Sequence, residues 1–169
     1  MLIQLELKNW KNRPMLLRPY DMDLDNITSI LFDVCEFLED FGKFKVSGFG
    51  QKSWPVTIGT DFAVFLEQLP ELIQAVSSGM PAEIDFYEQG IERVLTLSPK
   101  LETYIISCSS RTSWQPDPQN EHVDQASLIL MLSKVQDEFI GFLSAAAPDL
   151  IEHPWVKIWI NGKFNIAGK

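Results

Sequence analysis

The sequence predicts an α+β protein in which three main helices pack on a mostly antiparallel sheet of about five to six strands. Three segments carry apolar residues at helical spacing, and several short segments alternate apolar with polar residues. Four strand candidates lack an intervening long crossover, which favours antiparallel pairing. The chain has 169 residues, of which 46% are apolar, and this suits a single globular domain over residues 1–169.

The first half of the chain mixes short strands with helices. Residues 2–8 alternate and predict a half-buried strand, whereas residues 26–41 have apolar side chains every three or four positions and predict an amphipathic helix. Two short strands are expected around residues 44–46 and 54–58. A second helix is predicted over residues 62–76, because its apolar residues again fall on one face.

The second half begins with strands and ends with a long helix. Residues 83–97 predict a β-hairpin, residues 101–108 a further strand, and the polar, proline-bearing segment 109–120 a loop. A long helix is expected from residue 121 to residue 147. The tail, 154–166, stays open: an Asn-Gly pair favours a type I′ hairpin, but the spacing of its tryptophans and isoleucines also suits a helix.

The stretch "KVSGFGQKSWPVTIGTDF", residues 45–62, has the glycine content of a phosphate-binding loop. It lacks the lysine and hydroxyl that a P-loop places after its last glycine. Ser53 stands where a dinucleotide fingerprint needs its third glycine, and a strand rather than a helix is expected to follow. Gly48 and Gly50 are therefore interpreted as turn residues with positive φ, and no cofactor site is predicted.

Metal binding and catalysis have weak support. The acids of Asp21–Asp25 resemble the opening of a calcium loop, but the glycine and the glutamate expected further along that loop are absent. The histidines, His122 and His153, have no cysteine or acid at ligand spacing. No metal site and no catalytic residue are predicted. The alternative is a small enzyme with an unrecognised active site, built on Cys108 or on the Asp21–Asp25 acids with a metal.

Negative charge is concentrated in one part of the chain. The net charge is −9, and residues 21–92 hold fourteen acidic residues against three lysines, a net charge of −11. Such a field disfavours nucleic acid and anionic membranes and favours a basic protein partner. The start of the chain lacks the apolar core of a signal peptide, and the two cysteines suggest no disulfide framework, so a cytoplasmic protein is expected.

The predicted hairpin combines acids with aromatic residues on what should be an exposed turn. Carboxylates around aromatic anchors are typical of a surface that binds a basic protein. Trp114, in the polar loop, is a second candidate for an exposed aromatic anchor. The predicted partner-binding residues are Glu83, Asp85, Tyr87, Glu88, Glu92 and Trp114.

The phrase "VSGFGQKSWPVTIGTDFAVFLEQLPELIQAV", followed by "IDFYEQGIERVLTLS", resembles small bacterial immunity proteins that accompany polymorphic toxins. The resemblance covers residues 44–98 and contains no catalytic signature. It implies a non-enzymatic protein that binds a cognate toxin, often a basic nuclease, and blocks its active site. The acidic field would then stand in for the phosphate backbone that the toxin expects.

Overall fold

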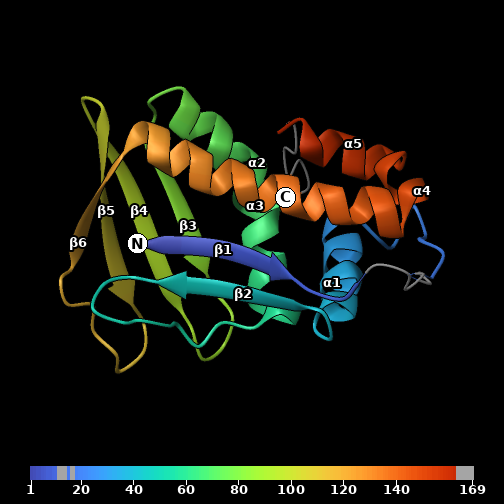
Figure 1. Ribbon diagram of the computed structural model, residues 1–169, viewed down its shortest axis with the longest axis horizontal. Coiled ribbons are helices and arrows are strands. Elements are labelled where there is room, and N and C mark those ends of the chain that lie inside the picture. Colours follow the sequence, from blue (N-terminus) through green and yellow to red (C-terminus); the bar gives the residue numbers. More distant parts are fainter. Residues whose placement is uncertain (11–14, 16–17, 163–169) are drawn as a thin grey trace.

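The computed structural model describes residues 1–10, 15 and 18–162 and has six strands in two separate antiparallel sheets (Figure 1). β1 (Leu2–Leu7) pairs with β2 (Gly42–Ser47) to form the smaller sheet. The larger sheet has its strands in chain order: β3 (Ala82–Phe86), β4 (Arg93–Lys100), β5 (Thr103–Ser110) and β6 (Asn120–Asp124). The predicted α+β class and antiparallel pairing are confirmed, but the prediction of one sheet is wrong.

The three main helices of the prediction are present, together with shorter ones. α1 (Ile27–Leu38) follows β1, and the π-helical turn η1 (Ile58–Phe62) leads directly into α2 (Ala63–Ser77). α3 (Gln125–Ala146) is followed by two short helices, α4 (Pro148–Ile151) and α5 (Pro154–Ile160). Among the described residues, no helix is both long and apolar enough to cross a bilayer.

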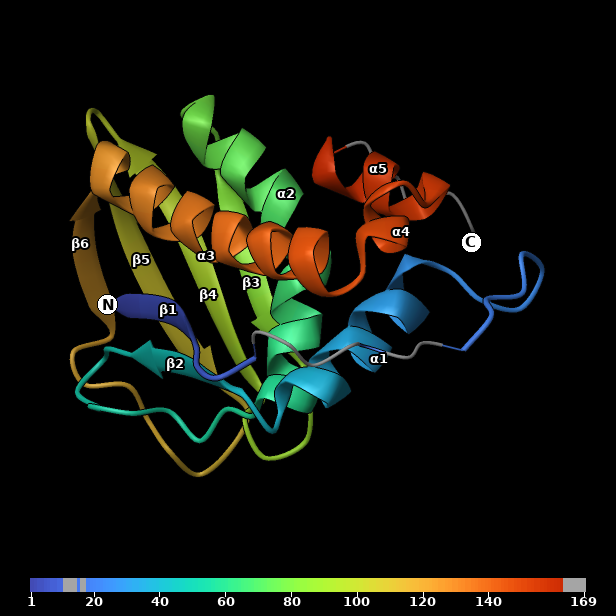
Figure 2. The same ribbon diagram turned by 45° about the vertical axis from the view of Figure 1, so that its right-hand side comes forward.

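The larger sheet has one buried face and one face open to solvent. On β3 the side chains of Ile84 and Phe86 are fully buried, whereas those of Glu83 and Asp85 lie on the open face, as strand alternation requires. Figure 2 shows α2 and α3 lying across the buried side of this sheet. Tyr104 of β5 anchors the packing, because its hydroxyl donates to the carbonyl of Met80, just after α2, at 2.9 Å.

A cluster of aromatic rings joins the smaller sheet to α2 and β3. Phe44 of β2 lies 4.9 Å from Phe62 and 5.5 Å from Phe65, measured between ring centroids. Phe65 in turn stacks on Phe86 of β3, with centroids 6.2 Å apart and planes 5° from parallel. Trp54 meets the edge of Phe86 at 5.9 Å. Offset and edge-to-face pairs of this kind add to the stabilisation from burial alone.

Three carboxylate contacts fix local geometry near the ends of these elements. The side chain of Asp124 accepts the N–H of Ser127 at 2.8 Å and so caps α3. Asp61 accepts the N–H of Thr57 at 2.6 Å and closes the turn that opens η1. Glu121 of β6 pairs with the amino group of Met1 and accepts the N–H of Phe49, which ties the two sheets together.

Two expectations about individual elements are wrong, and the structure decides the alternative that the tail had left open. Residues 120–124 form the edge strand β6, so the long helix begins at 125 and not at 121. Residues 54–57 lie outside the strands. The N–H of Trp54 donates to the carbonyl oxygen of Val46, but this hydrogen bond does not continue into a strand ladder before the chain turns into η1. The tail is helical over 154–160, which rules out a hairpin there, and residues 163–166 lie outside the described residues.

Candidate functional site

A groove of about 550 Å³ lies between α2 and β3, and it is the strongest candidate for a functional site. We call it the acidic groove. Four carboxylates line it: Glu67, Glu71, Glu83 and Asp85. Its other lining residues are uncharged, and they come from α2, from the segment around β3 and from the first turn of α1. Within the described part of the chain, no basic side chain lines this groove.

Two regular periodicities bring the four carboxylates together. Glu67 and Glu71 are four residues apart on α2 and therefore lie on the same side of that helix. Glu83 and Asp85 are two residues apart on β3 and therefore lie on the same face of the sheet. Because α2 packs along β3, the helix pair and the strand pair face one groove.

Part of the acidic groove is held by internal contacts. Arg111 donates to Asp85 Oδ2 at 3.1 Å, and the Tyr87 hydroxyl donates to Glu67 at 3.0 Å. Asp85 Oδ1 is shielded from solvent and has no hydrogen-bond partner among the described residues. No ion pair to Glu71 or Glu83 is found within the described residues. These two carboxylates are therefore the groove charges most available to a partner.

Tyr87 provides an apolar surface at the groove, since 46% of this residue is exposed. Partial burial raises the pKa of its hydroxyl, and the neighbouring Glu67 carboxylate raises it further. Burial also raises the pKa values of the other two tyrosines, Tyr20 and Tyr104. All three phenols of the chain are thus held in the neutral form.

We expect alkaline titration of the folded protein to show tyrosine ionisation shifted above the midpoint of a free phenol, about pH 10. Above that pH the folded chain binds more protons than the unfolded chain, so the free energy of unfolding falls as pH rises. Phenolate absorbance and circular dichroism, followed together, should change in one joint transition. Ionisation near pH 10 in a chain that keeps its native circular dichroism would contradict this, and the urea-unfolded chain provides the control midpoint.

The structure brings only half of the predicted partner-binding residues to the acidic groove. Glu83, Asp85 and Tyr87 line it. Glu88 and Glu92 lie on the connection between β3 and β4, are half-buried, and do not line the groove. The prediction missed Glu67 and Glu71, although their spacing of four on a predicted helix was a usable signal.

Trp114 is not the freely exposed anchor that the sequence suggested. Its ring is half-buried, and the guanidinium of Arg93 lies 3.5 Å from the ring centroid. The same guanidinium lies 4.4 Å from the centroid of the Trp54 ring. Arg93 is only 3% exposed, and burial lowers its pKa. The contacts of Trp114 in this structure therefore enclose a buried cation by cation–π packing.

The residues considered for the alternative function, a small enzyme, do not lie together in one site. Cys108 lies on the buried face of the larger sheet, where burial raises the pKa of its thiol to about 11 and favours the unreactive neutral form. His122 lies on β6 opposite Ile105, on the open face, so the sheet itself separates this histidine from the thiol. His153 instead accepts the N–H of Trp155 at the start of α5.

The acids of Asp21–Asp25 are engaged in local structure. Asp21 Oδ1 accepts the N–H of Asp23 at 2.8 Å. Arg18 donates to both oxygens of Asp25, at 2.6 and 2.8 Å, and holds the pKa of that carboxyl well below its usual range. Within the described residues, no group of three or more His, Cys, Asp or Glu side chains is placed to hold a metal ion.

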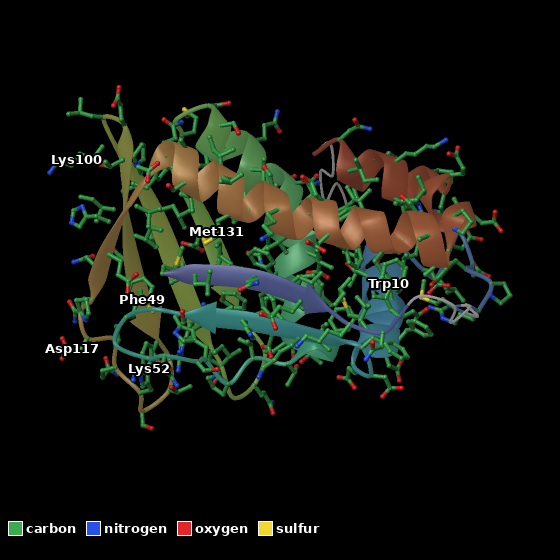
Figure 3. The ribbon with its side chains drawn as sticks, viewed as in Figure 1. Trp10, Phe49, Lys52, Lys100, Asp117 and Met131 are labelled. Atoms are coloured by element: carbon green, nitrogen blue, oxygen red, sulfur yellow. The ribbon has the colours of Figure 1, made fainter. Side chains whose placement is uncertain are left out.

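A second groove, of about 270 Å³, lies between β1 and α3. Its lining is mainly apolar and includes Leu2 and Leu130, which are 43% and 70% exposed. Met131 of α3 points toward β1, and its sulfur accepts the N–H of Ile3 at 3.2 Å (Figure 3). Of the described residues in this lining, Lys134 alone is charged, so they offer little electrostatic selectivity.

Comparison of the chain with protein-family models, with curated proteins and with solved structures finds no match.

Proposed function

We propose that this is a cytoplasmic binding protein that neutralises a basic protein partner by occlusion, as an immunity protein does with a bacterial toxin domain. The observation that supports it most is the acidic groove, where four carboxylates converge and no basic side chain lies among the described residues of the lining. A basic nuclease domain suits this role, because a cleft that binds phosphate groups is complementary in charge to a row of carboxylates. The resemblance of residues 44–98 to immunity proteins points the same way.

Electrostatics would determine how quickly such a complex forms. A cleft lined by one sign of charge focuses the field and raises association rates with an oppositely charged partner by about 10- to 1,000-fold. Tyr87 lies at the same groove and offers the aromatic anchor that protein interfaces favour. Charge would thus guide the encounter, and burial of Tyr87 would slow dissociation.

The test compares two double variants that change the net charge equally. Glu71→Lys/Glu83→Lys reverses the two groove carboxylates without an ion pair, and Glu88→Lys/Glu92→Lys reverses two carboxylates of the nearby β3–β4 connection. The partner to use is a basic toxin-like domain encoded by a gene next to this one. Association rates are measured by stopped flow at low and at high salt.

We expect the groove variant to associate at least about 10-fold more slowly at low salt, and this difference should shrink at high salt. The connection variant should lose much less, because its charges lie outside the groove. Equal losses for the two variants would mean that only the net charge matters and would overturn the acidic groove as the binding site. Unchanged rates for both would overturn the proposed function.

A further inference from the structure

We infer that the basic partner enters the acidic groove as an extended segment and pairs its backbone with the free edge of β3 at Glu83. This rests on the proposed function and specifies how the partner is held. β3 is an outermost strand of the larger sheet and the one closest to α2 (Figures 1 and 2). Edge strands present backbone groups that can pair with another chain, and peptide recognition often uses them.

The contacts of Asp85 show which backbone groups of β3 face outward. Its N–H donates to the Gln68 side chain at 2.9 Å, and its C=O accepts from the same side chain at 3.0 Å. The backbone of Asp85 therefore points away from β4 and toward α2. Groups two residues apart in a strand point the same way, so the N–H and C=O of Glu83 also face outward.

The hydrogen bonds of the neighbouring strands independently show that the backbone groups of Glu83 face outward. Cys108 donates its N–H to Gln119, on the β6 side, so it faces away from β4. Leu95, the partner of Cys108 in the β4–β5 register, must then face β3 and exchange hydrogen bonds with Ile84. Because backbone directions alternate along β3, the N–H and C=O of Glu83, next to Ile84, again face away from β4. No hydrogen bond to its N–H or C=O from outside the sheet is found among the described residues.

Gln68 shows that this edge accepts an amide in the geometry of an added strand. Its side chain both donates to and accepts from the backbone of Asp85, as a residue of a paired strand would. At Glu83, two positions earlier, the open acidic groove occupies the position that the Gln68 side chain occupies at Asp85. A peptide can therefore add one pair of hydrogen bonds next to the pair that Gln68 already makes.

Charge complementarity selects the side chains of the added segment. Successive side chains of a strand point to opposite faces, so one set would lie beside Glu83 and the other toward α2, where Glu71 lies. Lysine or arginine in either set meets a carboxylate that has no ion pair within the described residues. The occupant that fits is an extended segment rich in Lys or Arg.

The experiment uses a heptapeptide of alternating lysine and valine and two analogues of it. One analogue carries N-methyl groups on the odd residues and the other on the even residues, so charge and composition are closely matched. Binding to the full chain is followed by NMR titration, and the exchange rate of the Glu83 amide proton is measured with and without the parent peptide. N-methylation removes donors along one edge of the peptide only.

We expect the parent peptide to slow exchange of the Glu83 amide, and one analogue alone to bind about 10-fold more weakly, because its N-methyl groups remove the hydrogen bond to the Glu83 carbonyl and obstruct close approach to the strand edge. Equal affinities for the parent and both analogues, with unchanged Glu83 exchange, would overturn the edge pairing but leave the acidic groove as a binding site. Failure of the parent to bind would also overturn it. The stopped-flow comparison above decides the proposed function separately.

Discussion

Replacing Phe86 with alanine is expected to lower the free energy of unfolding by about 3–5 kcal/mol. Phe86 is fully buried and contacts rings from three other segments: it stacks on Phe65 at 6.2 Å and lies 5.9 Å from Trp54 and 6.4 Å from Phe44. Removal of the ring leaves a cavity that no single neighbour can fill. The variant would therefore lose stabilisation from the packing of the smaller sheet against both α2 and β3.

Urea denaturation followed by circular dichroism measures this loss. Phe86→Leu is the matched control, because it keeps most of the apolar volume while removing the aromatic contacts, and it should lose clearly less than the alanine variant. The slope of the unfolding free energy with urea should stay constant, so that the change reports stability alone. A loss below about 1 kcal/mol for Phe86→Ala would show that the cluster repacks and is not the centre of the core.

Replacing Gly50 with alanine is expected to cost about 3 kcal/mol or more, from two separate causes. Gly50 has φ of 80°, a conformation that L-residues adopt at a cost of about 1–2 kcal/mol. A Cβ atom at this position would also lie 2.0 Å from the carbonyl oxygen of Asp117. That backbone is fixed, since Asp117 donates its N–H to Phe49 at 3.1 Å (Figure 3).

Gly90→Ala isolates the first cause. Gly90 also has positive φ, of 97°, but nothing lies within 4 Å of its added Cβ atom. We expect this control to lose only the backbone cost of about 1–2 kcal/mol in the same urea experiment. Equal losses for Gly50→Ala and Gly90→Ala would mean that the loop around Asp117 moves away freely and does not constrain the turn at Gly50.

Most helices and strands were predictable because their side chains divide cleanly between buried and exposed faces. β6 was not, since residues 120–124 are polar except for Val123 and lie at a sheet edge, where only Glu121 and Val123 are half-buried. The segment 54–58 showed the opposite problem. Its apolar alternation imitates a strand, but Trp54 is buried in the aromatic cluster and Ile58 begins a π-helical turn.

The acidic groove was only half predictable, for a tertiary reason. The alternation of β3 placed Glu83 and Asp85 on one face, and the sequence alone indicated this. The spacing of Glu67 and Glu71 likewise indicated a shared side of a helix. That this side meets β3 follows from how α2 docks on the sheet, which local patterns do not encode. The partial burial of Trp114 depends on Arg93 and Trp54, and residues so distant in the chain are not associated by periodicity.

The contacts of β1 also constrain the order in which the chain can assemble on the ribosome. β1 can pair with β2 soon after residue 47 is synthesised. Its remaining contacts come from much later in translation, because Met1 pairs with Glu121 and Ile3 donates to Met131. β1 emerges before the other elements of this fold but completes its set of contacts among the last, and until then its outer edge is left open to other nascent chains.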